Sequence, residues 1–252
     1  MNKEFSFSVI RKALLTSDFV IAARMYGSWL YDEMSVDCDI AVLIPSVSGL
    51  VDSNTYRLLL ILRDYLVAET GNDIDLVPHT TDELDDVRSP LWYPRYNPSL
   101  VSGKVVKGEF AISPITKSEQ KFSFADLTAY VIHDNRTICR RQLVRSLQGE
   151  SGRIFVSKSL HGAGNALTFH ACQKKTEYLC SPSDINQSFE ILDSVYGVDS
   201  NPARAFLQSC KYSFDFEKGL LLMSWYESLV AMVFDKANTH LYQMTCRRLQ
   251  LS

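Results

Sequence analysis

Apolar segments with the length and alternation of β-strands occur only in the first half of the chain. They are short, and turn-forming residues such as Gly27 and Pro45 bound them. Two longer segments of the same half, residues 5–15 and 55–70, have the apolar spacing or length of helices. Residues 55–70 are apolar on almost every side, which predicts a buried helix. We expect strands over residues 19–26, 39–45, 73–79 and 104–109.

After about residue 117 the pattern is helical. Ser123 with Asp126 predicts a helix start, and residues 149–152 (GESG) predict a break. A half with strands followed by a helical half predicts an α+β fold, with one domain over residues 1–115 and an all-α domain over residues 116–252. We expect helices over residues 123–147, 155–178 and 219–236, a further helix start at residues 181–184, and a helix stop at Gly197.

The composition excludes several classes of protein. The 252 residues are 46 % hydrophobic and 22 % charged, which is the ordinary mix of a globular protein. We find no run of roughly 18 uncharged apolar residues, and the N-terminal residues lack the features of a signal peptide. The six cysteines are scattered without zinc-ligand spacing, which is typical of reduced thiols. We therefore expect a cytoplasmic protein that does not bind membranes.

The charge is distributed unevenly along the chain. The net charge of −3 divides into −5 for residues 1–117 and +2 for residues 118–252. Residues 136–175 contain eight basic residues and a single acidic one. A carboxylate-rich half joined to a basic stretch suits chemistry that combines metal ions with phosphate groups.

Two aspartates, Asp37 and Asp39, stand at the beginning of an apolar strand. Because side chains two residues apart on a strand point to the same face, the two carboxylates are expected to project together. Two carboxylates this close repel each other unless a cation lies between them. Hard oxygen ligands such as these favour Mg²⁺ or Mn²⁺. Upstream, Gly27 and Ser28 follow another strand, where a tight turn can bring backbone N–H groups and a hydroxyl close to a phosphate.

A third carboxylate, Asp75, lies inside the apolar strand predicted over residues 73–79. Burying a charge there is costly without a partner, so two interpretations are open. Asp75 is either paired with a basic residue such as Arg63, or it is a third acid beside Asp37 and Asp39. In the second case the three acids would hold two metal ions, and Asp75 would help to take the proton from an attacking hydroxyl.

The arrangement Gly27-Ser28, eight intervening residues, Asp37-x-Asp39 and then an aspartate in a later apolar strand resembles the DNA polymerase β-type nucleotidyltransferase superfamily. The resemblance covers roughly residues 18–109. Within the superfamily the chain is similar to small bacterial nucleotidyltransferases with a helical C-terminal domain, which include aminoglycoside nucleotidyltransferases. The resemblance implies an N-terminal nucleotidyltransferase domain with a mixed sheet.

The resemblance also implies roles for individual residues. Gly27 and Ser28 would hold the triphosphate. Asp37, Asp39 and Asp75 would bind the metal, and Asp75 would also be the catalytic residue. The cofactor would be two Mg²⁺ ions, with Mn²⁺ as the substitute, and the co-substrate an NTP, with ATP expected. The reaction would move a nucleoside monophosphate from the NTP to a hydroxyl of an acceptor and release pyrophosphate.

The basic residues of the second half allow more than one interpretation. Arg136, Arg140 and Arg145 recur at about helical spacing, either as the solvated cationic face of an amphipathic helix or as a wall that faces phosphates. We also predict that Lys158 and Arg153 contact phosphate. The resemblance favours Lys158, because a basic helical residue recurs in the second domain of the family.

Two local patterns complete the first half. Thr80 with Glu83 has the spacing of a capping box and predicts the start of a short helix. Residues 91–98 (LWYPRYNP) predict either an aromatic loop packed against the core or a stacking wall for a nucleobase or an acceptor ring.

Three functions follow as hypotheses. The first is nucleotidyl transfer to a small hydroxylated molecule, for which the family suggests an aminoglycoside, although the basic stretch 136–175 favours an anionic acceptor. The second is modification of tRNA or of a partner protein, as in toxin-like and defence-related members of the superfamily. The third is a non-catalytic binding protein with the same fold, suggested by the unusual acids and aromatics of residues 29–33.

Overall fold

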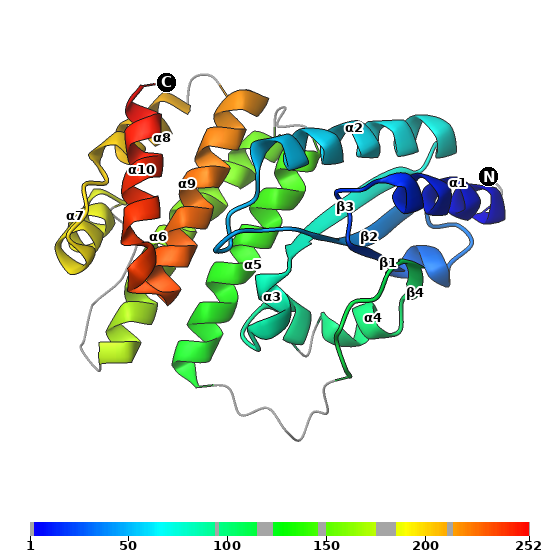
Figure 1. Ribbon diagram of the computed structural model, residues 1–252, viewed down its shortest axis with the longest axis horizontal. Coiled ribbons are helices and arrows are strands. Elements are labelled where there is room, and N and C mark those ends of the chain that lie inside the picture. The colour runs from blue at the N-terminus through cyan, green and yellow to red at the C-terminus, as the bar shows by residue number, and fades with distance from the viewer. Residues whose placement is uncertain are drawn as a thin grey trace. The chain divides into compact units, whose positions relative to one another are not determined.

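The computed structural model describes residues 3–93, 96–114, 123–145, 150–174, 185–210 and 214–251 (Figure 1). It confirms the α+β fold class, with a sheet and helices in the N-terminal half and a largely helical C-terminal region. The chain forms two compact units, which we call the sheet unit (Met1–Val47 with Val51–Gln120) and the helical unit (Ser48–Leu50 with Lys121–Ser252). The predicted domain boundary at residues 115–116 lies outside the described residues and stays a prediction.

The sheet unit is built around a four-stranded mixed sheet with the order β3-β2-β1-β4. Strands β2 and β3 run parallel, whereas β1 pairs antiparallel with both β2 and β4. The four strands lie at the four places that the alternation of apolar residues predicts. Their bounds are Ala22–Tyr26 for β1, Asp37–Ile44 for β2, Asp73–Thr80 for β3 and Lys104–Lys107 for β4.

Helices α1 (Lys3–Thr16) and α2 (Ser53–Thr70) pack against each other and cover one face of this sheet (Figure 1). Helix α2 begins at the N-cap Asp52 and ends at Gly71, whose φ of 62° lies in the left-handed region that glycine adopts without strain. The helix predicted over residues 55–70 is confirmed, but the prediction that it is buried was wrong for one side of it. Ile61 is 64 % exposed, because a helix that packs on one face of a sheet leaves its other side in water.

The opposite face is partly covered by short elements: α3 (Asp82–Asp85), η2 (Pro90–Trp92) and α4 (Asn97–Val101). Leu91 and Leu100 are buried against the sheet in one apolar cluster, and Trp92 and Tyr96 pack against that cluster. The Trp92 Nε1–H also donates to the Leu84 carbonyl at 3.0 Å. The described part of residues 91–98 therefore packs against the core, as one of the two interpretations predicts, but as the end of η2 and the start of α4 with a short connection between them. Pro94 and Arg95 lie outside the described residues.

The described helical unit consists of long helices that pack in pairs. Helix α5 packs against α6 and α9, and α10 packs against α8 and α9. The six helices are α5 (Phe124–Val144), α6 (Glu150–Lys174), α7 (Ile185–Tyr196), α8 (Asn201–Cys210), α9 (Phe216–Phe234) and α10 (Thr239–Gln250). Sequence analysis does not find α8 and α10, two short amphipathic segments. Nowhere in the described ranges is a helix both long and apolar enough to cross a membrane.

The predicted helix ends have mixed outcomes. Ser123 and Asp126 form the expected capping box at the start of α5. Gly197 ends α7 with a φ of 66°, and its N–H donates to the Asp193 carbonyl at 2.8 Å. The break expected at residues 149–152 was wrong for its last three residues, because α6 already begins at Glu150. The start expected at residues 181–184 lies outside the described residues.

Candidate metal centre

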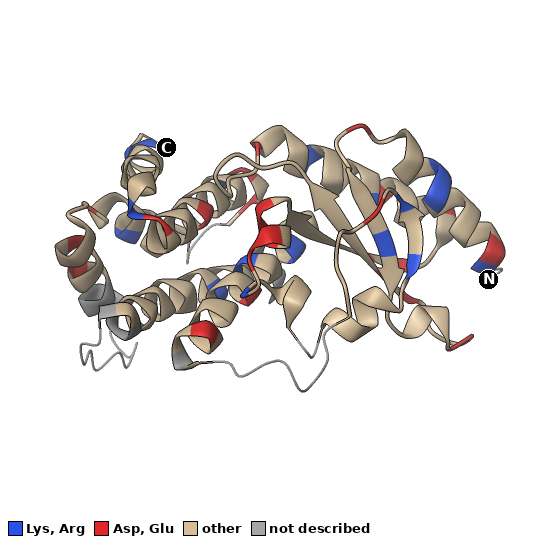
Figure 2. Cartoon of the chain, turned by 60° about the horizontal axis from the view of Figure 1, so that its bottom comes forward, with Lys and Arg blue, Asp and Glu red and all other residues tan. Residues whose placement is uncertain are grey.

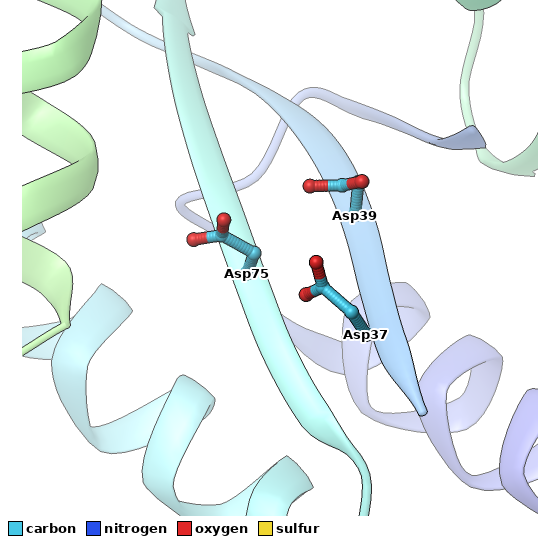
Figure 3. Close-up of side chains that lie close together, drawn as sticks. All are labelled: Asp37, Asp39 and Asp75. Atoms are coloured by element: carbon cyan, nitrogen blue, oxygen red, sulfur yellow. The ribbon is translucent and has the colours of Figure 1, made fainter. Parts of the chain in front are cut away.

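Three aspartates of the sheet unit converge where strands β2 and β3 begin (Figure 3). Asp37 and Asp39 come from β2, and Asp75 comes from β3, where it is the register partner of Asp39. One carboxylate oxygen from each residue lies within 4.8 Å of the others. Asp37 is exposed, Asp39 is half-buried and Asp75 is fully buried, so the group runs from solvent into the sheet.

The strand geometry explains why these three residues meet. Asp37 and Asp39 are two residues apart and therefore share a face, and parallel in-register pairing places Asp75 beside Asp39 on that face. Three like charges at this separation repel one another, and a divalent cation relieves that repulsion. The donor set consists of carboxylate oxygens only, which fits Mg²⁺ or Mn²⁺. Asp37, Asp39 and Asp75 thus form a possible metal site.

The turn that follows β1 lies directly against this group. Gly27 has a φ of 83° and a ψ of −170°, a combination that is nearly restricted to glycine. A Cβ atom at this position would lie 2.7 Å from Oδ2 of Asp39. Ser28, the other predicted turn residue, is exposed, and its Oγ lies 3.0 Å from Oγ of Ser35. The structure therefore brings Gly27 to the carboxylates and leaves the Ser28 side chain on the surface.

Lys3, on helix α1, forms hydrogen bonds with the same turn. Its Nζ donates to the carbonyl of Trp29 and, at 2.6 Å, to the carbonyl of Asp32. The ammonium group also lies 4.8 Å from the centre of the Trp29 ring, within the range of a cation–π interaction. The segment of residues 29–33, which is rich in acids and aromatics, is held in place here by a residue that sequence reasoning missed. A contact with a residue so distant in the chain leaves no local signal.

The alternative partner of Asp75, Arg63, is used elsewhere. The Arg63 guanidinium lies 3.3 Å from Asp73 and 3.2 Å from Asp64, and its Nε donates to the Ile74 carbonyl. The salt bridge that we considered for Asp75 is therefore made by Asp73, its neighbour on the outer edge of the sheet. Asp75 stays with the other two acids.

A network of polar side chains, of which His79 and Glu83 are fully buried and Tyr96 is half-buried, lies on the same face of the sheet, farther along β3. The Nδ1 atom of His79 lies 2.8 Å from Oε2 of Glu83, and its Nε2 atom lies 3.1 Å from the hydroxyl of Tyr96. The edge of one ring of Tyr96 and Tyr26 packs against the face of the other, with the ring centroids 5.3 Å apart, and Tyr26 is the register partner of Asp39. Burial raises the pKa of Tyr96 well above its usual range, and the neighbouring Tyr26, Asp39 and Glu83 raise it further.

This network replaces the capping box that the sequence predicts. Helix α3 begins after Thr81, which makes no side-chain capping hydrogen bond. The carboxylate of Glu83 turns instead into the protein, where it meets His79 and, at 3.4 Å, the hydroxyl of Thr80. The expected capping box was wrong because a buried histidine four residues upstream competes for the carboxylate.

The two predicted phosphate ligands of the second half lie together on α6. Arg153 is exposed and Lys158 is half-buried, and both line one surface pocket with Ile154 and Ser157. They belong to the helical unit, whereas the three aspartates belong to the sheet unit. Contacts of Lys158 and Arg153 with phosphate stay a prediction.

Two of the three predicted arginines, Arg136 and Arg140, match neither of the two interpretations, whereas Arg145 is half-buried. Arg136 and Arg140 are buried, so they form neither a solvated face nor an open wall. The Arg140 Nε–H lies 2.8 Å from the Glu227 carboxylate, and Nη2 of Arg136 lies 3.0 Å from Nδ1 of His133. Acidic and basic positions are interspersed along the described helices of this unit (Figure 2). The charges of Arg136 and Arg140 are therefore part of the packed interior.

Comparison with known proteins adds no relative. No family model, no curated protein and no solved structure matches the chain. The geometry therefore carries the functional argument: an α+β protein with a mixed sheet presents a possible metal-binding group of three carboxylates.

Proposed function

We propose that the protein is a metal-dependent nucleotidyltransferase of the DNA polymerase β type. One observation carries the proposal: three aspartates from adjacent parallel strands converge within 4.8 Å beside a glycine turn. The distances support what the spacing of Gly27, Asp37, Asp39 and Asp75 suggests. The reaction moves a nucleoside monophosphate from an NTP, with ATP as the first to test, to a hydroxyl of an acceptor, and pyrophosphate leaves.

Each residue has a stated part in this proposal. Asp37, Asp39 and Asp75 would hold the metal, Mg²⁺ or Mn²⁺, as two ions. When bound, such ions neutralise phosphate charge and stabilise the attacking and leaving oxygens. The N–H groups of the turn at Gly27 and Ser28 would bind the triphosphate, since a turn that lacks a Cβ atom lets the backbone approach closely. The buried carboxylate of Asp75 would accept the proton of the attacking hydroxyl.

The acceptor that we propose is a small hydroxylated molecule. The basic stretch of α5 and α6 is an argument for an anionic acceptor only if its charges face solvent. Arg136 and Arg140 are buried, and Arg140 is paired with Glu227. The charge argument against a cationic acceptor such as an aminoglycoside is therefore weaker than the sequence suggests, and acceptors of both signs belong in the test, tRNA and protein included.

The test is transfer of label from each α-³²P-labelled NTP, with Mg²⁺ or Mn²⁺, to separate pools of aminoglycosides, tRNA and cell protein. The inactive variant is the double change Asp37→Ala with Asp39→Ala. The matched control is Asp73→Asn, which removes an acid from β3 that pairs with Arg63 and lies outside the three-carboxylate group.

Label in the small-molecule pool that is lost in the double variant and kept in Asp73→Asn supports the proposal. Label in the tRNA or protein pool with the same dependence keeps the reaction and replaces the acceptor. Absence of label in every pool, together with absence of metal-dependent NTP binding, would leave a non-catalytic binding protein and overturn the proposal.

A further inference from the structure

The buried network behind the metal centre forms a continuous chain of polar side chains. It begins at Tyr26, whose backbone pairs with that of Asp39 across neighbouring strands, so the two side chains are neighbours on one face. It continues to Tyr96, whose ring packs edge-to-face with that of Tyr26 at 5.3 Å between centroids and whose hydroxyl lies 3.1 Å from Nε2 of His79. It ends with Nδ1 of His79 at 2.8 Å from Glu83.

The surroundings of this chain are apolar. His79 and Glu83 are 0 % exposed, and Tyr26 belongs to the same buried cluster as Leu91 and Leu100. A buried histidine–carboxylate pair seldom stabilises a fold more than apolar side chains of equal volume would, because both groups lose their hydration. What such a pair gives is a fixed geometry, since every alternative arrangement leaves a polar group unsatisfied.

The fixed geometry reaches the metal centre through two neighbouring residues. Tyr26 lies beside Asp39, and Gly27, which follows Tyr26, approaches Oδ2 of Asp39 so closely that it has no room for a Cβ atom. A shift of the Tyr26 ring would therefore shift the turn against which the Asp39 carboxylate rests. The far end of the chain is anchored by Glu83, whose carboxylate lies 2.8 Å from Nδ1 of His79 and fixes the orientation of the imidazole ring.

We propose that Glu83, His79, Tyr96 and Tyr26 are positioning residues that hold the Asp39 carboxylate in its metal-binding orientation. The inference rests on the proposed function in one respect: the three aspartates must bind a divalent cation. It adds that affinity for this cation depends on buried groups that do not touch it, as outer hydrogen-bond partners do at other metal sites.

The decisive variant is Tyr96→Phe, which keeps the ring that contacts Tyr26 and removes the hydroxyl that ties this ring to His79. We expect Mn²⁺ affinity, measured from the loss of the free-ion electron paramagnetic resonance signal, to fall about 10-fold. The matched control is Trp92→Phe, which removes a hydrogen bond of 3.0 Å to Leu84 from the same loop and apolar cluster but outside the chain. It should leave Mn²⁺ affinity unchanged.

A second variant, Glu83→Gln, tests the far end and keeps the inference falsifiable if one variant folds poorly. Near-ultraviolet circular dichroism and urea unfolding identify the variants that are folded under the titration conditions. If the residues act as one chain, Tyr96→Phe combined with Glu83→Gln should lower Mn²⁺ affinity no more than the stronger single change does.

The outcomes separate the two proposals. Failure of the unaltered protein to bind Mn²⁺, or binding that survives Asp37→Ala with Asp39→Ala, overturns the metal site and with it the proposed function. Binding that the double change abolishes, while folded Tyr96→Phe and Glu83→Gln keep full affinity, overturns the positioning chain alone. An equal loss in Trp92→Phe also overturns it, because the effect would then belong to the loop in general.

Discussion

Each of the two units of the protein has a buried carboxylate, but the charged groups near the two carboxylates have opposite signs. In the helical unit, Glu227 meets Arg140 at 2.8 Å, and both side chains are fully buried. In the sheet unit, Asp75 is equally buried, and two further carboxylates, those of Asp37 and Asp39, lie within 4.8 Å of its own. A residue count alone would describe both places as charges inside a protein.

The difference separates structural charges from a site. The opposite charges of Arg140 and Glu227 compensate each other within the fold, so their presence is explained without a ligand. The three aspartates bring like charges within 4.8 Å of one another, and a bound divalent cation would relieve their mutual repulsion. The buried charge of Glu227 is therefore matched within the fold, whereas that of Asp75 belongs to a possible metal site.

The comparison is tested most strongly at Asp39. Asp39→Asn should lower nucleotidyl transfer by roughly four orders of magnitude, about 5 kcal/mol of lost transition-state stabilisation. In chelator it should leave the free energy of unfolding unchanged or slightly higher, because one of three repelling charges is gone. Initial rates of label transfer and urea unfolding measure the two effects. A large loss of stability without metal would contradict the assignment of Asp39 to a site.

Arg140 should respond in the opposite way. Arg140→Met leaves the Glu227 carboxylate buried without its ion-pair partner, which should cost about 3–5 kcal/mol of unfolding free energy. Adding Glu227→Leu should restore most of that loss, because no uncompensated charge then remains. Urea titrations of the two variants decide the point. If the double variant is as unstable as the single one, the loss does not come from an uncompensated charge on Glu227, and Arg140 stabilises the fold through other contacts.

The sequence predicts the placement of the three aspartates better than it predicts the environment of the basic residues. Strand alternation places Asp37 and Asp39 on one face, and the pairing with Asp75 needs only two parallel strands in register. No such local rule decides whether Arg140 faces water or Glu227, because the two residues lie on different helices and meet only through packing. Long-range contacts are the part of a fold that a one-dimensional pattern does not contain.

The missed residues have the same explanation. His79 and Glu83 have a helical spacing, yet His79 belongs to a strand and Glu83 to the helix after it. Lys3 reaches the turn at Trp29 from the first helix. Thr80 with Glu83 predicts a capping box because their spacing matches one, whereas nothing in the sequence indicates that His79 is buried and contacts Glu83. The predicted roles of Lys158 and Arg153 depend on the placement of a bound phosphate and remain predictions.

Metal binding should stabilise the protein through the three aspartates of the sheet unit and should not depend on the Arg140–Glu227 pair of the helical unit. At a Mn²⁺ concentration 100 times the dissociation constant, the free energy of unfolding should rise by about 2.7 kcal/mol through mass action alone. The rise should vanish in Asp39→Asn and persist in Arg140→Met, measured as a difference from that variant in chelator. A rise that survives in Asp39→Asn would place the ion elsewhere and remove the distinction between the two groups of charges.

The smallest effect separates strain from function at two glycines. Gly27 and Gly197 both have positive φ, but a Cβ atom at Gly27 would lie 2.7 Å from Oδ2 of Asp39, whereas nothing lies within 4 Å of one at Gly197. Gly197→Ala should cost about 1 kcal/mol of stability from backbone strain alone. Gly27→Ala should cost about 1–3 kcal/mol, since its φ and ψ combination is nearly restricted to glycine.

The clash at Gly27 adds little to that cost, because the end of the Asp39 side chain can rotate away from the new methyl group. The rotation takes an oxygen out of the three-carboxylate group, so Mn²⁺ affinity should fall in Gly27→Ala and stay unchanged in Gly197→Ala. Urea unfolding in chelator and Mn²⁺ titration of both variants give the two quantities. Equal affinities would mean that the turn and the Asp39 carboxylate are independent, and the turn would then have no part in the metal centre.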